Sequence, residues 1–191
     1  MNMLTDSHDA VTADWAAALL DFWFNQVGEA GWWRHDRSLD RQCTIGYHQL
    51  WQDKQILSAE TFLNRADDAL AAVLLFDQMP RNMFRGTAQA FATDALAREV
   101  ARGAIAQGYD IQIGGAGRLF FYMPFQHSEA IEDQTLSLSL FDGAGDERWL
   151  DFARQHHATI ARFGRFPHRN AALGRETRPE EAEAAAEGAG W

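Results

Sequence analysis

A chain of 191 residues, 47% hydrophobic and 23% charged, has the composition of one globular domain with a sizeable core. Its 13 Phe and 7 Trp exclude a fully disordered chain, and its longest apolar run, 69–76, is far shorter than the roughly 20 residues that cross a bilayer. The net charge of −10 disfavours nucleic acid as a partner, and the single cysteine, Cys43, excludes an internal disulfide.

The first residues carry acidic side chains and no apolar stretch, which argues against a signal peptide. A single cysteine suits a reducing compartment, so we expect the protein in the cytoplasm and away from membranes. The basic residues are unevenly chosen and unevenly placed: Lys54 is the only lysine, and arginines cluster over 154–178.

Helical spacing of apolar residues dominates the first half of the chain. One stripe, 15–23, predicts a helix that Thr12 caps through its hydroxyl. A second stripe, 39–51, predicts a helix with Ser38 as its cap. The Ala- and Leu-rich stretch 64–79 predicts a third helix.

Prolines and glycines are expected to end the next elements. Pro80 closes the third helix because it lacks an amide N–H, and a loop follows over 80–86. We expect a helix over 87–108, a flexible glycine joint at 114–117, and a short aromatic helix at 119–123 that the next proline stops.

The last third is also predicted to be helical. Ser128 caps a helix that reaches residue 141, and Asp146 caps the next helix, which Gly164 ends in the left-handed conformation. A loop or short turns over 165–175 separate that helix from a capping box at 177–180.

These stripes predict a set of core positions: Trp15, Leu19, Phe22, Leu50, Trp51, Leu74, Phe91 and Ile160. On the helix after Asp146, the apolar face is expected to include His157.

The fold class that follows is all-α. We expect a single domain over 1–181, built from about seven or eight stacked antiparallel helices, and a weakly ordered tail over 182–191. Short alternating runs at 110–113 and 135–140 are too weak to predict strands.

Three segments mix polar side chains with large apolar ones in a way that a plain core does not need: 76–86, 120–129 and 162–170. Placing polar groups beside bulky apolar ones is costly unless the polar groups meet one another. We therefore expect the three segments to converge. Asp77 and Arg81 are four residues apart and could pair if the helix continued through Pro80.

The same segments carry a resemblance. LLFDQMPRN at 74–82, YMPFQHSE at 122–129 and RFGRFPHRN at 162–170, with DFWF at 21–24, resemble the signature blocks of the bacterial domain-of-unknown-function 924 family. The resemblance spans about 19–181 and implies an all-helical, tetratricopeptide-like fold. It implies no activity, because the family's role is not established.

One departure from the family pattern is visible near the end of the chain. Where the family continues Arg-Glu-Ser-Thr-Pro-Glu-Glu, residues 175–181 are RETRPEE. Thr177 can still cap a helix, but Arg178 replaces the second hydroxyl.

The arginines suggest a polar groove for a small anionic or peptide-like ligand, because guanidinium forks bind carboxylate or phosphate in pairs of hydrogen bonds. The candidate ligand-binding residues are Asp77, Arg81, Asn82, Arg85, His127, Glu129, Arg162, Arg165, His168, Arg169, Asn170 and Arg175. Internal pairing is the alternative, since acids such as Asp94, Glu132 and Asp133 are numerous enough to neutralise most of these arginines. The sequence leaves both interpretations open.

An enzyme is a further alternative, with His127 or His168 and Asp77 or Glu129 exchanging a proton with the substrate. No catalytic residue can be assigned, no cofactor is implied, and no histidine spacing suits a metal site. Cys43 lies mid-stripe and is expected to be an inert core thiol. A helical scaffold for a protein segment and a homo-oligomer remain open as well.

Overall fold

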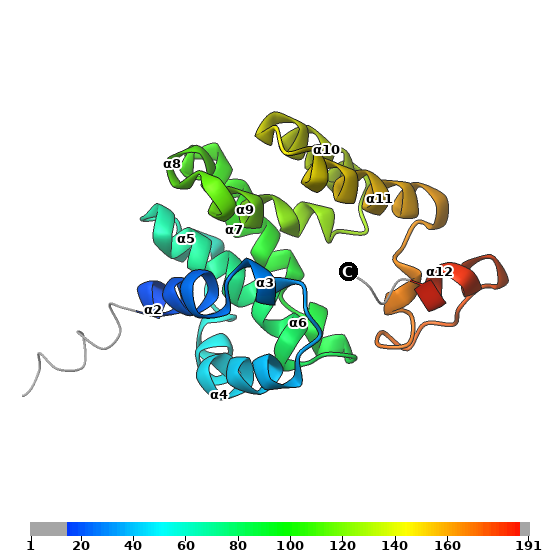
Figure 1. Cartoon of the computed structure of the whole chain (residues 1–191), viewed down its shortest axis with the longest axis horizontal. Coiled ribbons are helices and arrows are strands. Elements are labelled where there is room, and N and C mark those ends of the chain that lie inside the picture. Colours follow the sequence, from blue (N-terminus) through cyan, green and yellow to red (C-terminus); the bar gives the residue numbers. More distant parts are fainter. Residues whose placement is uncertain (1–14, 188–191) are drawn as a thin grey trace, which may run out of the picture.

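The computed structural model describes residues 15–187, and within that range the chain is all-helical, as expected (Figure 1). In chain order the α-helices are α2 (Trp15–Asp21), α3 (Glu29–Trp32), α4 (Arg37–Lys54), α5 (Ala66–Val73), α6 (Met79–Met83), α7 (Asp94–Ala106), α8 (Tyr109–Ile113), α9 (Gly115–Gln126), α10 (Ile131–Ala144), α11 (Glu147–Phe163) and α12 (Ala182–Glu187). Short helices such as α3, α6, α8 and α12 raise the number of segments above seven or eight.

Tighter and wider helical turns join these elements. The π-helical segments are η1 (Phe22–Val27) and η3 (Leu74–Gln78). The 3-10 segments are η2 (Ala59–Phe62), η4 (Ala88–Phe91), η5 (Pro167–Arg169) and η6 (Pro179–Glu181).

The run of α5, η3 and α6 forms the centre of the core. Every residue from Ala69 to Pro80 is buried, and α2, α7 and α9 pack around α5. This central position explains why the stretch is apolar all round rather than on one face. Among the predicted core residues, Leu19, Phe22, Trp51, Leu74 and Ile160 are buried, whereas Trp15, Leu50 and Phe91 are partly buried.

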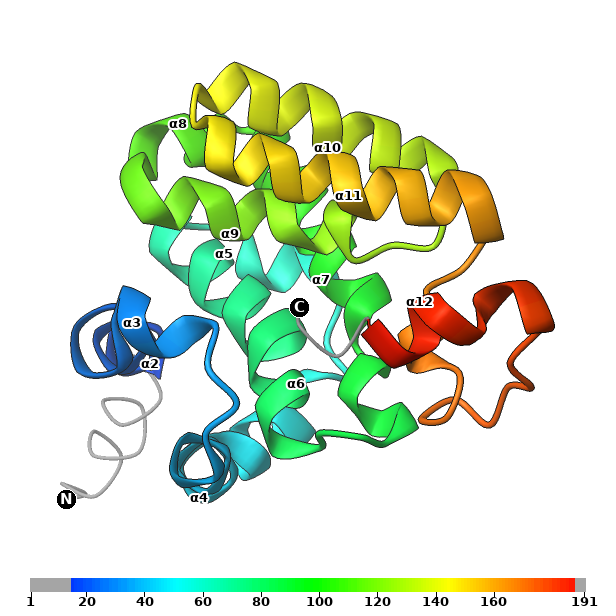
Figure 2. The ribbon, with the colours of Figure 1, turned by 45° about the vertical axis from the view of Figure 1, so that its right-hand side comes forward.

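Later helices cover this centre from one side. Figure 2 shows α10 and α11 side by side, running in opposite directions, with α9 beneath them. Gly145 links the two through a left-handed turn (φ 76°). The chain then returns through η5, η6 and α12, which lie apart from the α2–α4 end of the molecule in both views.

The expected break at Pro80 is wrong. The helical path continues from Ala66 to Met83, and the expected loop shrinks to the turn over 84–86. In a regular helix the Phe76 carbonyl would accept an N–H from position 80; here it accepts the hydroxyl of Thr93 at 2.7 Å. That replacement satisfies the carbonyl left free by proline.

The expected flexible joint at 114–117 is wrong too. Residues 115–117 begin α9, which runs through Pro124 and ends at Gln126. A Cβ on Gly117 would overlap a methyl group of Ile113 and would lie 3.1 Å from Leu70. Glycine therefore permits close packing of helices here, and not flexibility.

Several caps differ from expectation by one or two residues. Asp36, not Ser38, caps α4, since its carboxylate accepts the Ser38 N–H at 2.7 Å. Ser128 instead closes a turn by accepting the Ala130 N–H, and α10 begins after it. The capping box expected at 177–180 is replaced by a single bond, in which the Arg178 N–H donates to the Glu181 carboxylate at 3.0 Å.

Two expected helix ends are confirmed, and one lies outside the described range. Asp146 caps α11 by accepting from the N–H groups of Arg148 and Trp149, and Gly164 ends it at φ 70°. Thr12 lies outside the described residues, as do residues 188–191 of the expected tail. The part of that tail over 182–187 is helical.

Candidate functional site

Asp77 and His127, 50 residues apart, form the centre of the candidate site. Nδ1 of His127 lies 2.8 and 3.0 Å from the two carboxylate oxygens of Asp77. The Asp77 side chain is buried, whereas the His127 side chain keeps 15% of its surface exposed. Because a carboxylate accepts hydrogen bonds, this contact assigns the ring proton to Nδ1 and leaves Nε2 as the unprotonated nitrogen.

Asp77 is held by its own helical segment. It lies in η3, and π-helical turns are frequent at functional sites. The Gln78 side-chain amide donates to one Asp77 oxygen at 2.5 Å. Arg81 lies 3.2 Å from the other oxygen, which confirms the pairing expected for a helix that continues through Pro80.

Arg81 also connects this pair to the start of α7. Its two terminal nitrogens donate to both carboxylate oxygens of Asp94 at 2.9 and 3.1 Å. Asp94 is thus a main partner of Arg81, although it was not among the candidate site residues. The sequence had offered Asp94 only as one of several acids that could neutralise the arginines.

His127 is held by a buried glutamine of the next helix. The backbone of His127 ends α9, where carbonyl groups lack helical partners. The fully buried side-chain amide of Gln134 donates to the carbonyls of Gln126 and Ser128 at 2.7 and 2.6 Å. Packing of α10 on α9 therefore fixes the position from which His127 reaches Asp77.

Arg169 comes from the third sequence block and lies beside this centre. Its guanidinium lies between the rings of Phe91 and Phe166, at 4.6 and 4.5 Å from their centroids. Its nearest carboxylate oxygen, on Asp94, is 3.6 Å away. The residue is 7% exposed, and its buried Nε has no hydrogen-bond partner among residues 15–187.

Two further histidines surround the Phe166 ring. The centroids of His156 and His168 each lie 5.6 Å from that of Phe166, and the His156 ring lies 6.3 Å from the His127 ring. His156 is buried on α11, whereas His157, expected on the apolar face, is only partly buried. The stripe thus runs through 149, 153, 156 and 160, at spacings of three and four residues.

Burial sets the protonation of these groups. Burial, together with the positive charge of Arg169, lowers the pKa of His156 to about 3 and that of His168 to about 4. Burial also lowers the pKa of His127 and outweighs the opposing effect of Asp77. All three rings are therefore neutral at pH 7.

Asp77 is ionised throughout the ordinary pH range. Burial raises the pKa of its carboxyl group, but Arg81 and His127 lower it more, so that it lies well below its usual value. An ionised, buried carboxylate on Nδ1 and a neutral ring give His127 the arrangement of a general base.

Most remaining candidate residues form ion pairs inside the protein. Arg175 binds Glu129 through both terminal nitrogens at 2.8 and 3.0 Å, and Glu129 also accepts the Phe166 N–H at 2.7 Å. Arg85 binds Asp40 of α4 at 2.7 and 3.0 Å. These pairs hold the blocks in place.

The third block adds a second internal cluster around Glu181, a fully buried acid. Arg165 donates to its two oxygens at 2.8 and 2.7 Å, and Asn170 donates at 3.1 Å.

The two remaining candidate residues form no ion pair within residues 15–187. Asn82 donates to the Gln78 carbonyl at 3.0 Å. Arg162 is exposed and lies over the Phe163 ring.

The structure thus brings together Asp77, Arg81, His127, His168 and Arg169, and places the other candidates in contacts outside this centre. Sequence reasoning named Asp94 as an acid that could pair with the arginines, and missed Gln134 and His156 as supports of the site. His156 carried a signal, its helical spacing from Trp149 and Ile160. Gln134 carried none, because its role depends on which carbonyls the end of α9 leaves unpaired.

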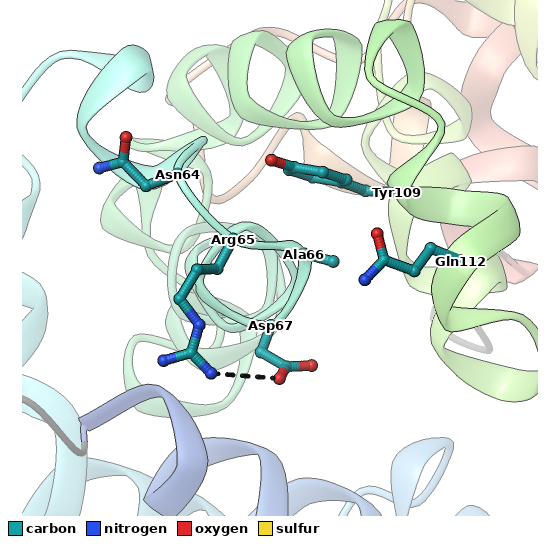
Figure 3. A pocket seen from close by; sticks show the side chains of 6 residues that line it. All are labelled: Asn64, Arg65, Ala66, Asp67, Tyr109 and Gln112. Carbon is teal, nitrogen blue, oxygen red and sulfur yellow. Dashed lines mark ion pairs between the residues drawn. The ribbon is translucent and has the colours of Figure 1, made fainter.

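Two surface depressions lie elsewhere. One, of about 330 Å³, is lined by polar side chains at the start of α5 and on α8; Figure 3 shows Arg65 turned away from Tyr109 and paired with the exposed Asp67. The other, of about 310 Å³, lies between α3, α9 and α11 and includes Trp32 and Trp149. Neither is lined by residues of the Asp77–His127 centre.

Other kinds of site find little support in the described part of the chain. Within residues 15–187 no group of three or more His, Cys, Asp or Glu side chains is arranged to hold a metal ion. No helix there is long and apolar enough to cross a membrane. Burial raises the pKa of Cys43 to about 12, which makes its thiol a poor nucleophile.

Comparison with known proteins decides the family. A family model described as a bacterial protein of unknown function (DUF924) matches residues 19–189. The chain belongs to this family. The structure is also similar to that of a protein of unknown function, ATU0120, from Agrobacterium tumefaciens: the two are 40% identical, with a TM-score of 0.86 over 92% of this chain and 99% of that one. No curated protein matches the chain.

DUF924 membership agrees with the all-helical fold and assigns no activity. The three blocks that carry the family resemblance supply Asp77, His127 and Arg169. In this DUF924 protein, these three blocks meet at the candidate site although they lie far apart in the sequence.

Proposed function

We propose that this DUF924 protein is a metal-independent acid–base enzyme acting on a small molecule, with His127 as the group that exchanges a proton with substrate. The observation that carries the proposal is the placement of both Asp77 oxygens within 3.0 Å of His127 Nδ1. Asp77 is the positioning residue, because it selects the tautomer and fixes the plane of the ring.

The burial of the pair supports this assignment. The Asp77 side chain is 1% exposed, and burying a carboxylate costs free energy of folding. An apolar residue at this position would carry no such cost. Asp77 ionises well below neutral pH, and the lowered pKa of His127 keeps its ring neutral, so Nε2 is available as a base.

The reaction class follows from what surrounds the pair. Ser128 is buried and accepts the Ala130 N–H, and Cys43 lies in the core, so neither serves His127 as a nucleophile. The chemistry that remains is removal of a proton from a substrate carbon or heteroatom, or from an attacking water. General base catalysis of this kind contributes about 10²–10⁴-fold to a rate.

Chemical labelling tests the proposal without knowledge of the substrate. Diethyl pyrocarbonate acylates neutral imidazole nitrogens, and mass spectrometry locates the product on each histidine. We expect His127 to react at pH 7, with the exposed His35 as an internal reference. Asp77→Asn should slow labelling of His127 and leave His35 unchanged, because an amide no longer stabilises the Nδ1–H tautomer.

A second buried acid supplies the matched control. Asp110 is 4% exposed and accepts the Tyr122 hydroxyl at 2.6 Å, so Asp110→Asn removes a buried carboxylate elsewhere. It should leave the labelling of His127 unchanged. An unreactive His127 in the wild-type protein, or equal effects of the two substitutions, would contradict the proposal.

The proposal includes a tetratricopeptide-like architecture and a cytoplasmic location. Antiparallel packing of α10 on α11 supports the first, and the single buried Cys43 suits a reducing compartment. A helical scaffold for a protein segment is the weaker function, since the buried acid of the Asp77–His127 pair has no use in such a scaffold.

A further inference from the structure

We propose that Arg169 binds the acidic group of the substrate, which is therefore a small carboxylate or phosphate. The inference deepens the proposed function and rests on it for the position of His127 beside the ligand. The sequence also led us to expect an anionic ligand, and this proposal assigns its binding to a single arginine.

Arg169 lacks a full ionic partner. Asp94 lies 3.6 Å from one of its nitrogens, but Asp94 already accepts both terminal nitrogens of Arg81. Nε of Arg169 is buried and makes no hydrogen bond to any residue in the described range. An arginine with 7% of its surface exposed normally forms several such bonds, so this one is short of acceptors.

Three other candidate arginines are paired more completely than Arg169. Each of them donates two hydrogen bonds to one carboxylate: Arg175 to Glu129, Arg85 to Asp40 and Arg165 to Glu181. Arg169 lies deeper than any of these three and is less well paired.

Two aromatic rings flank the guanidinium of Arg169. The Phe91 and Phe166 rings lie 4.6 and 4.5 Å from the guanidinium carbon and hold the group in place. A cation fixed before binding loses little conformational entropy when an oxyanion arrives. The fork then presents its hydrogen-bond donors in the arrangement that carboxylate and phosphate accept.

Two cations, Arg169 and Arg81, lie close enough to repel each other. Burial and Arg81 lower the pKa of Arg169 to about 10, although Asp94, Glu129 and Asp77 oppose this effect. Arg169 in turn lowers the pKa values of His127, His156 and His168. An anion at this point would relieve that repulsion, whereas a neutral or cationic ligand would not.

Ligand-induced stabilisation of the full chain tests the inference. The melting temperature is measured with inorganic phosphate and with succinate, against sodium chloride at the same ionic strength. We expect at least one of the two anions to raise the melting temperature of the wild-type protein with a saturable dose dependence. The two anions separate a phosphate site from a carboxylate site.

Substitutions assign the effect to Arg169. Arg169→Gln should weaken the anion by about tenfold or more, the loss expected for charge-assisted hydrogen bonds. Arg162→Gln removes an exposed arginine of the same block and should leave anion affinity unchanged. If Arg169→Gln fails to fold, Arg169→Lys keeps the charge without the fork and should also weaken binding.

The outcomes separate this inference from the proposed function. His127→Gln should retain the anion-dependent shift, because the fork of Arg169 remains. No specific shift in the wild-type protein, or an unchanged shift in Arg169→Gln, would overturn the anion site while leaving the His127 labelling result intact. A normal anion response with an unreactive His127 would overturn the acid–base role alone.

Discussion

Arg169 and Arg175 belong to the same loop region and illustrate how burial and pairing decide the role of a charged side chain. Arg175 shares two hydrogen bonds with Glu129, so it joins the loop to the start of α10. Arg169 lies between two rings and has a single loose ionic contact. The same residue type is thus a structural link at one position and the proposed binding group at the other.

Removal of these two arginines should affect stability differently. Arg175→Gln leaves Glu129 without its partner and should lower the free energy of unfolding by about 1–3 kcal/mol. Arg169→Gln removes a buried guanidinium whose charged form the fold disfavours, as its lowered pKa shows. This substitution should change the free energy of unfolding by less than about 1 kcal/mol. Urea unfolding of both variants without added anion measures the difference; a larger loss in Arg169→Gln would mean that Arg169 is a structural residue.

The buried histidines predict a stability that falls with acid. In the fold the pKa of His156 is lowered to about 3 and that of His168 to about 4, whereas in the unfolded chain both take protons below about pH 6.5. The unfolded state then binds more protons, so the free energy of unfolding decreases from about pH 6.5 downward. Each histidine contributes up to about 1.4 kcal/mol per pH unit.

Adjacent histidines on α11 provide the matched pair for this prediction. Urea unfolding between pH 7 and pH 5 should show a shallower dependence on pH in His156→Gln than in the wild-type protein. His157→Gln, at the less buried neighbour, should leave the dependence unchanged. Equal slopes in the two variants would show that burial of His156 does not set the acid response.

At the scale of elements, helical periodicity predicted the all-α class and most helix centres, because each amphipathic stripe marks a buried face. Prolines and glycines were misjudged, because their consequences depend on distant partners. Pro80 does not end its helix since Thr93 supplies the missing donor, and Gly117 packs against Leu70 in place of forming a joint. Neither partner can be identified from neighbouring sequence.

The central helical run makes a direct prediction for packing. Leu74 is fully buried at the start of η3, and Leu74→Ala should lower the free energy of unfolding by about 2–5 kcal/mol. Ile45→Ala, at a side chain that is 75% exposed on α4, should change it by less than about 0.5 kcal/mol. Urea unfolding gives both values, and a loss near zero for Leu74→Ala would mean that the run is not central.

Two helical glycines should respond in opposite directions to alanine. Nothing lies within 4 Å of a Cβ on Gly143 in α10, so Gly143→Ala should stabilise the protein by about 0.5–1 kcal/mol through helix propensity. Gly117→Ala should destabilise it, because the new methyl group overlaps Ile113. Melting temperatures of the two variants test the contrast, and a stabilising Gly117→Ala would remove the close-packing explanation.

At the scale of the whole molecule, three blocks far apart in the chain build one centre. Sequence reasoning predicted their convergence from the cost of burying polar groups beside apolar ones, and named Asp77, His127 and Arg169. It could not tell paired arginines from the loosely paired one, since pairing depends on which acids the fold brings near. The acid that binds Arg81, Asp94, comes from a helix outside the three blocks.

The tautomer of His127 tests the central claim most directly. Long-range proton–nitrogen NMR spectra of the imidazole groups at pH 8 show which ring nitrogen of each of the seven histidines carries the proton. If Asp77 positions His127 as a base, its proton lies on Nδ1 and Nε2 is unprotonated, and Asp77→Asn weakens this preference. A wild-type His127 with its proton on Nε2, or with the same mixture of tautomers as in Asp77→Asn, would contradict the account.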